Sequence, residues 1–178
     1  MAAIASRRKG RILAFQALYC WESNRVSSDE LLTFSWLGSK KLIDLDEGIA
    51  GFSRLLIMGT IENIQPIDEM IKSHLQNWDI SRLNRVDLAI LRMSVYTLMY
   101  QSEIAPSIVI DEAIGISKEF GTDDSYRFVN GVLDSINHTL LALIRTEPDR
   151  CKRAGVEPEV RGSPLQAEKG AVLSKNAL

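Results

Sequence analysis

The chain has 178 residues, 46% of them hydrophobic, with 21 Lys or Arg against 23 Asp or Glu. This is enough apolar side chain for one sizeable core, and the near-neutral balance excludes a generally basic nucleic-acid coat. The charge is placed unevenly: residues 1–11 hold four Lys or Arg and no acid, whereas residues 12–146 hold 11 Lys or Arg against 18 Asp or Glu. Any nucleic-acid contact is therefore expected to be local and made by one patch, and the acidic remainder could suit a basic partner on another face.

The two cysteines, Cys20 and Cys151, lie far apart in the chain and do not indicate a disulfide framework. A reducing cytoplasm is the expected compartment. The N-terminus lacks the apolar stretch and cleavage site of a signal peptide, and no apolar run approaches the roughly 20 residues of a membrane span. We therefore expect a cytoplasmic protein that makes no membrane contact.

The first predicted helix covers about 6–23, and between Ile12 and Trp21 only Gln16 is polar. A helix that is apolar all round is expected to run through the core. Its start holds four cations within five residues: Arg7, Arg8, Lys9 and Arg11. Cations oppose the helix dipole at this end, whereas phosphate is favoured there. The cluster is typical either of a solubilising N-terminal end or of a nucleic-acid-binding edge.

Helical spacing continues through the middle of the chain. A short helix is expected over 30–37, and a longer one from Asp44 or Asp46. Pro66 must kink this longer helix or begin a new segment, because proline lacks the donor N–H.

Residues 81–101 form a second predicted central helix, since apolar side chains spread almost all the way round it. Arg85 and Arg92 share one narrow polar stripe, which predicts surface ion pairs of little energetic worth. Pro106 is a favourable first residue for a helix through Phe120.

The last helix is expected over about 124–146, after Gly121 ends its predecessor. After Glu147 the periodicity stops, and residues 147–178 are predicted to form a flexible tail. The fold class is thus all-α, with residues 1–146 forming two small helical bundles that share a centre.

Three blocks of the sequence resemble the signature blocks of the NusB transcription antitermination family. They read SRRKGRILAFQALYCWE at 6–22, NRVDLAILRMSVYTL at 84–98 and IVIDEAIGISKEFGTDDSYRFVNGVLD at 108–134. The resemblance covers about residues 4–146 and implies the NusB-like fold, in which two small three-helix bundles share a central helical core. It implies binding of single-stranded boxA RNA in ribosomal RNA transcripts together with NusE, a protein of the small ribosomal subunit. The pair joins other Nus factors on RNA polymerase, and no reaction is catalysed.

The resemblance also implies which residues meet each partner. The RNA contacts fall on Arg7, Arg8, Lys9, Arg11, Gln16, Asp124, Arg127 and Phe128. Tyr19 and Asp87 match positions that meet NusE. Two residues depart from the family pattern: Leu88 stands where relatives often have Arg or Lys, and Thr97 stands where they often have Glu. These departures leave the detail of the partner face open.

The last helix leaves alternatives open on its own geometry. Phe128 lies at the rim of the apolar arc, where it could stack on a base or close the edge of the core. Asp124 could cap the helix, accept a hydrogen bond from a base, or do both. Gly131 costs about 1 kcal/mol inside a helix and could allow close helix packing or close RNA approach.

The sequence contains no metal-ligand spacing, P-loop or nucleophile elbow, so we expect no metal, cofactor or catalytic residue. Two alternatives remain: a helical protein-interaction scaffold without specific RNA binding, and a stand-alone relative of the N-terminal domain of ribosomal RNA cytosine methyltransferases. The latter enzymes need a following α/β domain, whereas only about 30 residues follow here. The sequence is compatible with a monomer or a homodimer.

Overall fold

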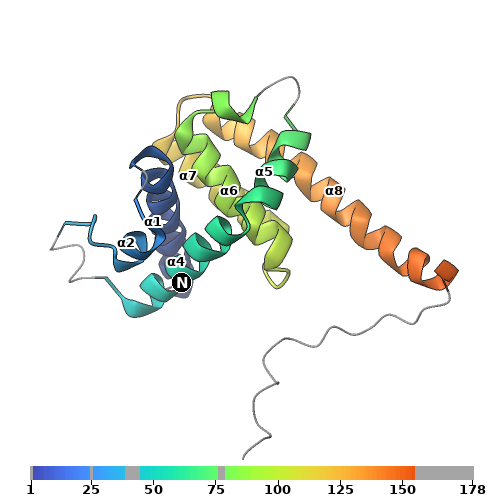
Figure 1. Ribbon diagram of the computed structural model, residues 1–178, viewed down its shortest axis with the longest axis horizontal. Coiled ribbons are helices and arrows are strands. Elements are labelled where there is room, and N and C mark those ends of the chain that lie inside the picture. Colours follow the sequence, from blue (N-terminus) through green and yellow to red (C-terminus); the bar gives the residue numbers. More distant parts are fainter. Residues whose placement is uncertain (1, 25, 39–44, 76–78, 155–178) are drawn as a thin grey trace, which may run out of the picture. The chain divides into compact units, whose positions relative to one another are not determined.

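The computed structural model describes residues 2–24, 26–38, 45–75 and 79–154, and all of its regular structure is helical (Figure 1). The elements are α1 (Ala2–Asn24), α2 (Ser28–Thr33), α4 (Glu47–Glu62), α5 (Ile64–Ser73), the 3-10 helix η1 (Ile80–Arg82), α6 (Arg85–Tyr100), α7 (Pro106–Phe120) and α8 (Ser125–Ala154). No strand occurs within these ranges, which confirms the predicted all-α class. The chain divides into two units, 1–141 and 142–178, and the packing described below belongs to the first.

Local signals set several helix ends. Asp46 caps α4 by accepting a hydrogen bond from the Ile49 amide at 3.0 Å. The prediction of a new segment at Pro66 is confirmed, because this proline lies in the first turn of α5, where no intrahelical donor is required. Asn84 caps α6, so this helix begins four residues later than predicted and is preceded by η1.

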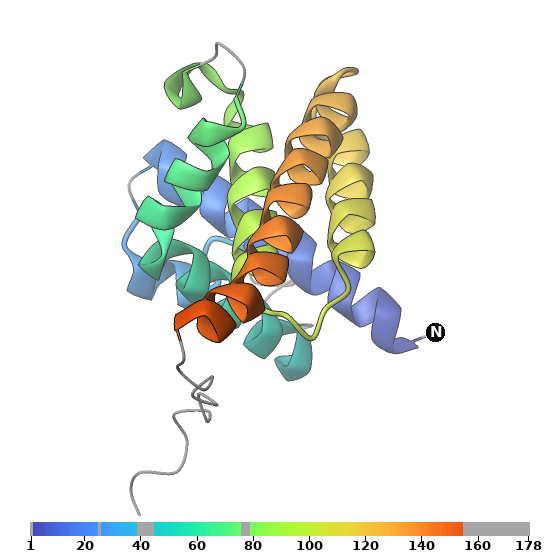
Figure 2. The same ribbon diagram turned by 90° about the vertical axis from the view of Figure 1, so that its right-hand side faces the viewer.

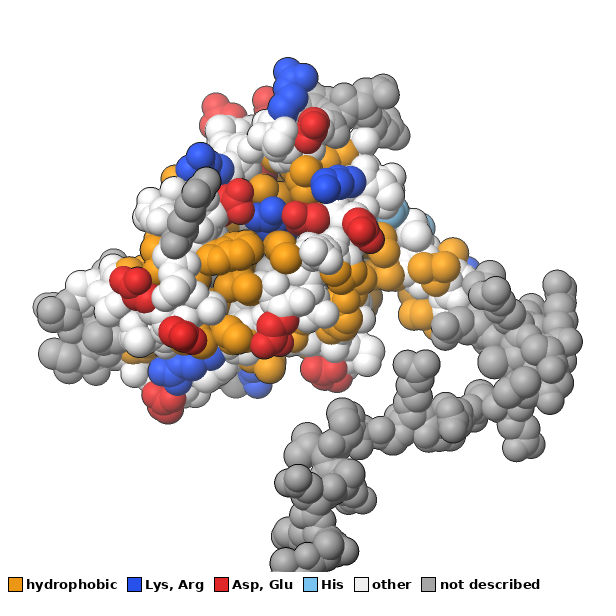
Figure 3. Space-filling model, viewed as in Figure 1, with side chains coloured by type: hydrophobic (Ala, Val, Ile, Leu, Met, Phe, Trp, Pro, Cys, Tyr) orange, Lys and Arg blue, Asp and Glu red, His pale blue; other side chains and the backbone are white. Residues whose placement is uncertain are grey.

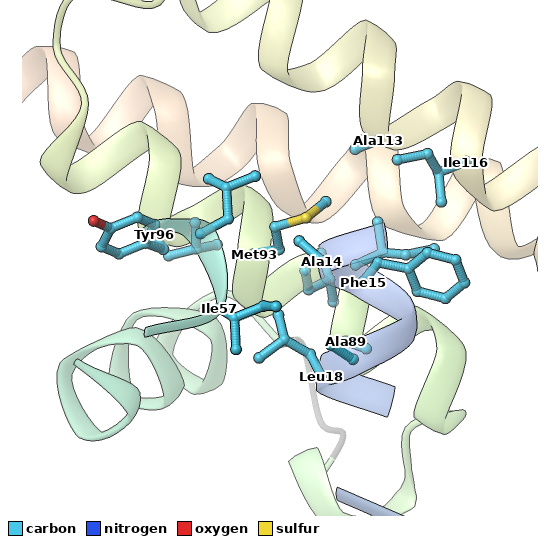
Figure 4. Close-up of a cluster of buried hydrophobic side chains, with 14 of the residues drawn as sticks. Ala14, Phe15, Leu18, Ile57, Ala89, Met93, Tyr96, Ala113 and Ile116 are labelled. Atoms are coloured by element: carbon cyan, nitrogen blue, oxygen red, sulfur yellow. The ribbon is translucent and has the colours of Figure 1, made fainter. Parts of the chain in front are cut away.

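Helices α1 and α6 form the centre of the unit, as predicted. Helix α1 packs against α4 and α6, and α6 also packs against α5 and α7 (Figures 1 and 2). Every residue of α6 from Asp87 to Thr97 is buried, which only a helix covered on all sides can achieve. Figure 4 shows side chains of α1, α4, α6 and α7 meeting in one cluster, among them Phe15, Ile57 and Ala113. The α8 side chains Val129, Val132, Leu133 and Ile136 complete this core.

Two glycines allow the close approach of α4 to the central helices. A Cβ atom at Gly59 would collide with the ring of Tyr96 on α6. A Cβ atom at Gly10 on α1 would lie 2.6 Å from Cδ1 of Phe52 on α4. Both positions need the absence of a side chain, and both contacts join segments that are distant in the sequence.

Arg92 is buried, so the prediction of a surface ion pair at this position is wrong. Its Nε and Nη2 atoms each lie 2.8 Å from an oxygen of Asp68 on α5, and its Nη1 lies 2.8 Å from Oε2 of Glu22 on α1. Burial lowers the pKa of Arg92, but its bonds to the two carboxylates outweigh this and raise the pKa overall. The residue therefore ties three helices together, through partners that a single-helix projection cannot reveal.

The turn between α7 and α8 is closed by its own side chains. Helix α7 runs from Pro106 to Phe120 as predicted, and the Thr122 amide then donates to Oγ of Ser125 at 2.9 Å. Helix α8 starts at Ser125 and reaches Ala154, which is longer than predicted. Residues 155–178 of the predicted tail lie outside the described residues.

Candidate nucleic-acid and protein interface

The basic start of α1 touches α4 on one side and α7 on the other. The Arg7 guanidinium lies 4.4 Å from the centroid of the Phe52 ring on α4, within cation–π range. The neighbouring Arg8 turns to α7, where it pairs with Glu112 at 3.4 Å and Glu119 at 3.2 Å. The two adjacent arginines are therefore held in different surroundings.

The four N-terminal cations also differ in exposure. Arg7 and Lys9 are exposed, and the Arg8 side chain keeps 36% of its surface accessible. Arg11 is only 7% exposed, and its guanidinium lies 5.5 Å from the Phe52 ring centroid. Burial lowers the pKa of Arg11, partly offset by the charge of Glu112. Of the four predicted phosphate contacts, Arg7 and Lys9 are the most accessible.

A second cationic cluster surrounds the start of α8. The Arg127 guanidinium lies 5.4 Å from the Tyr126 ring centroid, and Nζ of Lys118 on α7 lies 5.1 Å from the same centroid. Arg127 also pairs with Asp124 at 3.4 Å, and their side chains are 72% and 85% exposed. Arg127 and Asp124 were predicted from the sequence, whereas Lys118 and Tyr126 were not, because their proximity depends on how the turn folds.

The open alternatives at the start of α8 are narrowed by the structure. The Asp124 carbonyl accepts from the Phe128 amide at 3.2 Å, so Asp124 occupies the N-cap position while its carboxylate stays exposed. Phe128 is half-buried against the core and keeps part of its ring accessible. Gly131 is exposed, and a Cβ atom there would meet open space, so helix packing does not explain this glycine.

An aromatic pocket of about 330 Å³ lies where α1 meets the ends of α6 and α7. Its walls are Phe15, Gln16, Tyr19, Cys20, Trp36, Val86 and Phe120. Phe15 and Phe120 pack with their ring centroids 5.0 Å apart, and Tyr19 is 38% exposed at the wall. Gln16 and Tyr19 are the two pocket residues that were predicted from the sequence to belong to the site. The fold adds Trp36, Val86 and Phe120, which come from three other segments.

Asp87 follows the pocket residue Val86 but is only 7% exposed. Burial raises the pKa of its carboxyl, and a hydrogen bond with Ser125 at the start of α8 acts in the opposite direction. Its Oδ1 atom has no hydrogen-bond partner among the described residues. Asp87 therefore lies beneath the surface and is not directly accessible to a partner.

The two departures from the family pattern are also internal. Leu88 is 6% exposed and Thr97 is 3% exposed. The Thr97 hydroxyl donates to the Met93 carbonyl within α6 at 3.0 Å. These residues therefore affect helix packing and do not change the surface available to a partner.

The face drawn in Figure 3 shows acidic and basic side chains interspersed around exposed apolar ones. Within the described residues, no group of His, Cys, Asp and Glu is suited to hold a metal ion. Among the helices formed by these residues, none is long and apolar enough to cross a membrane.

Together, the helical core, the cationic α1 start and the aromatic pocket define an all-α binding protein. The model of the NusB family matches residues 8–138, and the chain belongs to this family. It is 54% identical over 132 residues to the transcription antitermination protein NusB of Treponema denticola, covering 74% of this chain and 96% of the relative. It is 40% identical over 127 residues to NusB of Borreliella burgdorferi, covering 71% and 89% respectively.

Solved structures agree with this assignment. The structure of NusB from T. maritima superposes with a TM-score of 0.65 at 34% identity, over 74% of this chain and 90% of the other. A crystal structure of antitermination factors NusB and NusE in complex with double-stranded RNA superposes with a TM-score of 0.65 at 25% identity. That match covers 76% of this chain and 98% of the other.

Proposed function

We propose that this chain is a transcription antitermination factor. It binds single-stranded boxA-type RNA of ribosomal RNA transcripts together with NusE and supports processive transcription by RNA polymerase. The observation that carries the proposal is the pairing of two kinds of surface in one unit: exposed cations at the start of α1 and α8, and an aromatic pocket beside them. The relatives named above are transcription antitermination proteins, and one neighbouring structure holds NusB, NusE and RNA.

RNA binding divides between charge and base contacts. Arg7 and Lys9 are exposed and can neutralise phosphates without losing any ion pair described in the structure. At the start of α8, the accessible part of the Phe128 ring offers a stacking surface, worth about 1–3 kcal/mol per base. The exposed Asp124 carboxylate can accept from a base amino group, and Arg127 can contact a phosphate.

The protein partner is expected at the aromatic pocket. Tyr19 at its wall presents a large amphipathic side chain, the type that dominates many protein interfaces. Gln16, which is a proposed RNA contact, lines the same pocket. NusE bound at the pocket would therefore lie close to the bound RNA. Asp87 is buried directly after Val86 of the pocket wall, so it is expected to support this face from beneath.

The proposed role is binding, in the cytoplasm, without catalysis. Burial raises the pKa of the Cys20 thiol in the pocket, which keeps it protonated and poorly nucleophilic. The proposed RNA and partner residues all fall within residues 1–146, the predicted domain. Of the predicted C-terminal tail, residues 147–154 belong to α8, and residues 155–178 lie outside the described residues.

Calorimetric titration with purified NusE tests the partner site. Tyr19→Ala is expected to weaken NusE binding by about tenfold or more, as truncation of a buried interface tyrosine does. Tyr100→Ala is the matched control, because this tyrosine is 45% exposed at the other end of α6. Equal affinities for the two variants would contradict the assignment of the pocket.

A further inference from the structure

Arg8 is held against α7 by a cradle that we define as Glu112, Gly115 and Glu119. The spacing of these residues, three and then four, places them on one face of the helix. The Arg8 Nη1 lies 3.4 Å from Oε2 of Glu112, and its Nη2 lies 3.2 Å from Oε2 of Glu119. The guanidinium thus bridges two turns of α7.

Gly115 makes room for this arrangement. A Cβ atom at Gly115 would lie 2.7 Å from Nη1 of Arg8 and 3.4 Å from its Nη2. Any other residue at this position would have to displace the end of the arginine side chain. The cradle therefore needs both the two acids and the missing side chain between them.

The charge of the cradle opposes the approach of an anion. Two carboxylates face one guanidinium, so the group carries a net negative charge around a residue proposed to meet phosphate. Glu112 also acts electrostatically on Arg11. Carboxylate and phosphate oxygens compete for the same guanidinium donors, so a phosphate can gain Arg8 only by displacing a carboxylate.

We propose that the cradle withholds Arg8 from RNA and sets the RNA affinity of this chain below what its basic N-terminus would otherwise give. The inference rests on the proposed RNA-binding function and adds a restraint built from α7. Glu112 and Glu119 are thereby assigned as affinity-determining residues that need not touch RNA themselves.

The direct test is fluorescence anisotropy with a short single-stranded boxA-type RNA. Glu119→Gln should tighten binding about two- to fivefold, the range that corresponds to a partly exposed ion pair. Glu103→Gln is the matched control, because it removes the same charge from an exposed site before the start of α7. It lies roughly 20 Å from Glu119 along the helix, beyond the screening length of about 8 Å at physiological salt. Its affinity should equal that of the wild type.

Two further variants separate release of Arg8 from a general loss of negative charge. Gly115→Ala keeps every charge and improves helix propensity, yet should push Arg8 out of the cradle and tighten RNA binding. In an Arg8→Ala background, Glu119→Gln should lose most of its effect.

The outcomes distinguish the cradle from the proposed function. If the wild type does not prefer boxA-type RNA over a scrambled sequence, the proposed function fails. If the wild type shows that preference but Glu119→Gln binds no better than Glu103→Gln, the cradle inference is overturned. Weaker binding by Glu119→Gln also overturns it, because the acids would then position Arg8 for RNA.

Discussion

Replacing Gly59 with alanine should destabilise this protein, although alanine favours helices. The added Cβ atom would collide with ring atoms of Tyr96, which is 8% exposed and enclosed between α4 and α6. Overpacking a filled core costs about 1–3 kcal/mol, and alanine returns about 1 kcal/mol of helix propensity. Because the obstacle is a buried ring rather than a flexible chain end, the upper end of the range applies. We expect a net loss of about 2 kcal/mol in the free energy of unfolding.

Gly51 in the same helix provides the matched control. It is exposed, and a Cβ atom there would meet nothing within 4 Å. Gly51→Ala should therefore stabilise the protein by up to about 1 kcal/mol through helix propensity alone. The two substitutions are chemically identical and should differ by about 3 kcal/mol in opposite directions.

Urea denaturation followed by far-ultraviolet circular dichroism measures both variants. The melting temperature of Gly59→Ala should fall by about 4–8 °C for a loss of this size. In a Tyr96→Ala background, Gly59→Ala should lose most of its cost, because the obstructing ring is gone. If Gly59→Ala is as benign as Gly51→Ala, the close approach of α4 to α6 is not as described.

Three further predictions concern the charged residues. Arg92→Met should lower the free energy of unfolding by about 3–5 kcal/mol in urea denaturation, because it leaves Asp68 and Glu22 without their guanidinium partner; a loss below about 1 kcal/mol would contradict a role in joining the helices. Asp87→Asn should stabilise the protein at neutral pH, because the pKa of the buried carboxyl is raised and the cost of its charge is present above that pKa. This gain should narrow as the pH falls through the folded-state pKa toward the ordinary value of about 3.9, and a thermal melt showing a less stable variant at neutral pH would refute the reasoning. RNA binding should depend weakly on salt, with a logarithmic slope of about −1.4 to −2.1 for two or three phosphate contacts. A slope steeper than about −3 in anisotropy titrations would contradict this, because it would require more cations than Arg7, Lys9 and Arg127 to bind phosphate.

Helix positions were predictable where the signals are local. Pro106 starts α7 and Phe120 ends it, as a proline at the first position and a following glycine indicate. The two central helices were recognisable because their apolar residues leave almost no polar face. The end of α8 was missed because its last turns continue past the apolar periodicity on which the prediction depended.

The site was predictable only in outline, for a physical reason. The sequence places four cations together, but Arg8 and Arg11 are distinguished by Glu112, Glu119 and Phe52, all more than forty residues away along the chain. Wheel projections likewise give the direction of a side chain on its own helix and say nothing of the neighbouring helix. The pocket could not be assembled from the sequence, since its walls come from α1, the segment after α2, and the ends of α6 and α7.

The central proposal is tested most directly by anisotropy titration of labelled RNA, with and without NusE. The probes are a single-stranded boxA-type RNA, a scrambled strand of equal length, and the duplex of the boxA sequence. Arg7→Ala/Lys9→Ala is compared with Lys72→Ala/Arg85→Ala, which removes the same charge from exposed sites on α5 and α6. We predict tightest binding to the boxA strand, a further gain with NusE, and a loss confined to the α1 variant. Equal binding to all three RNAs, unchanged by NusE and equally weakened in both variants, would contradict the proposal.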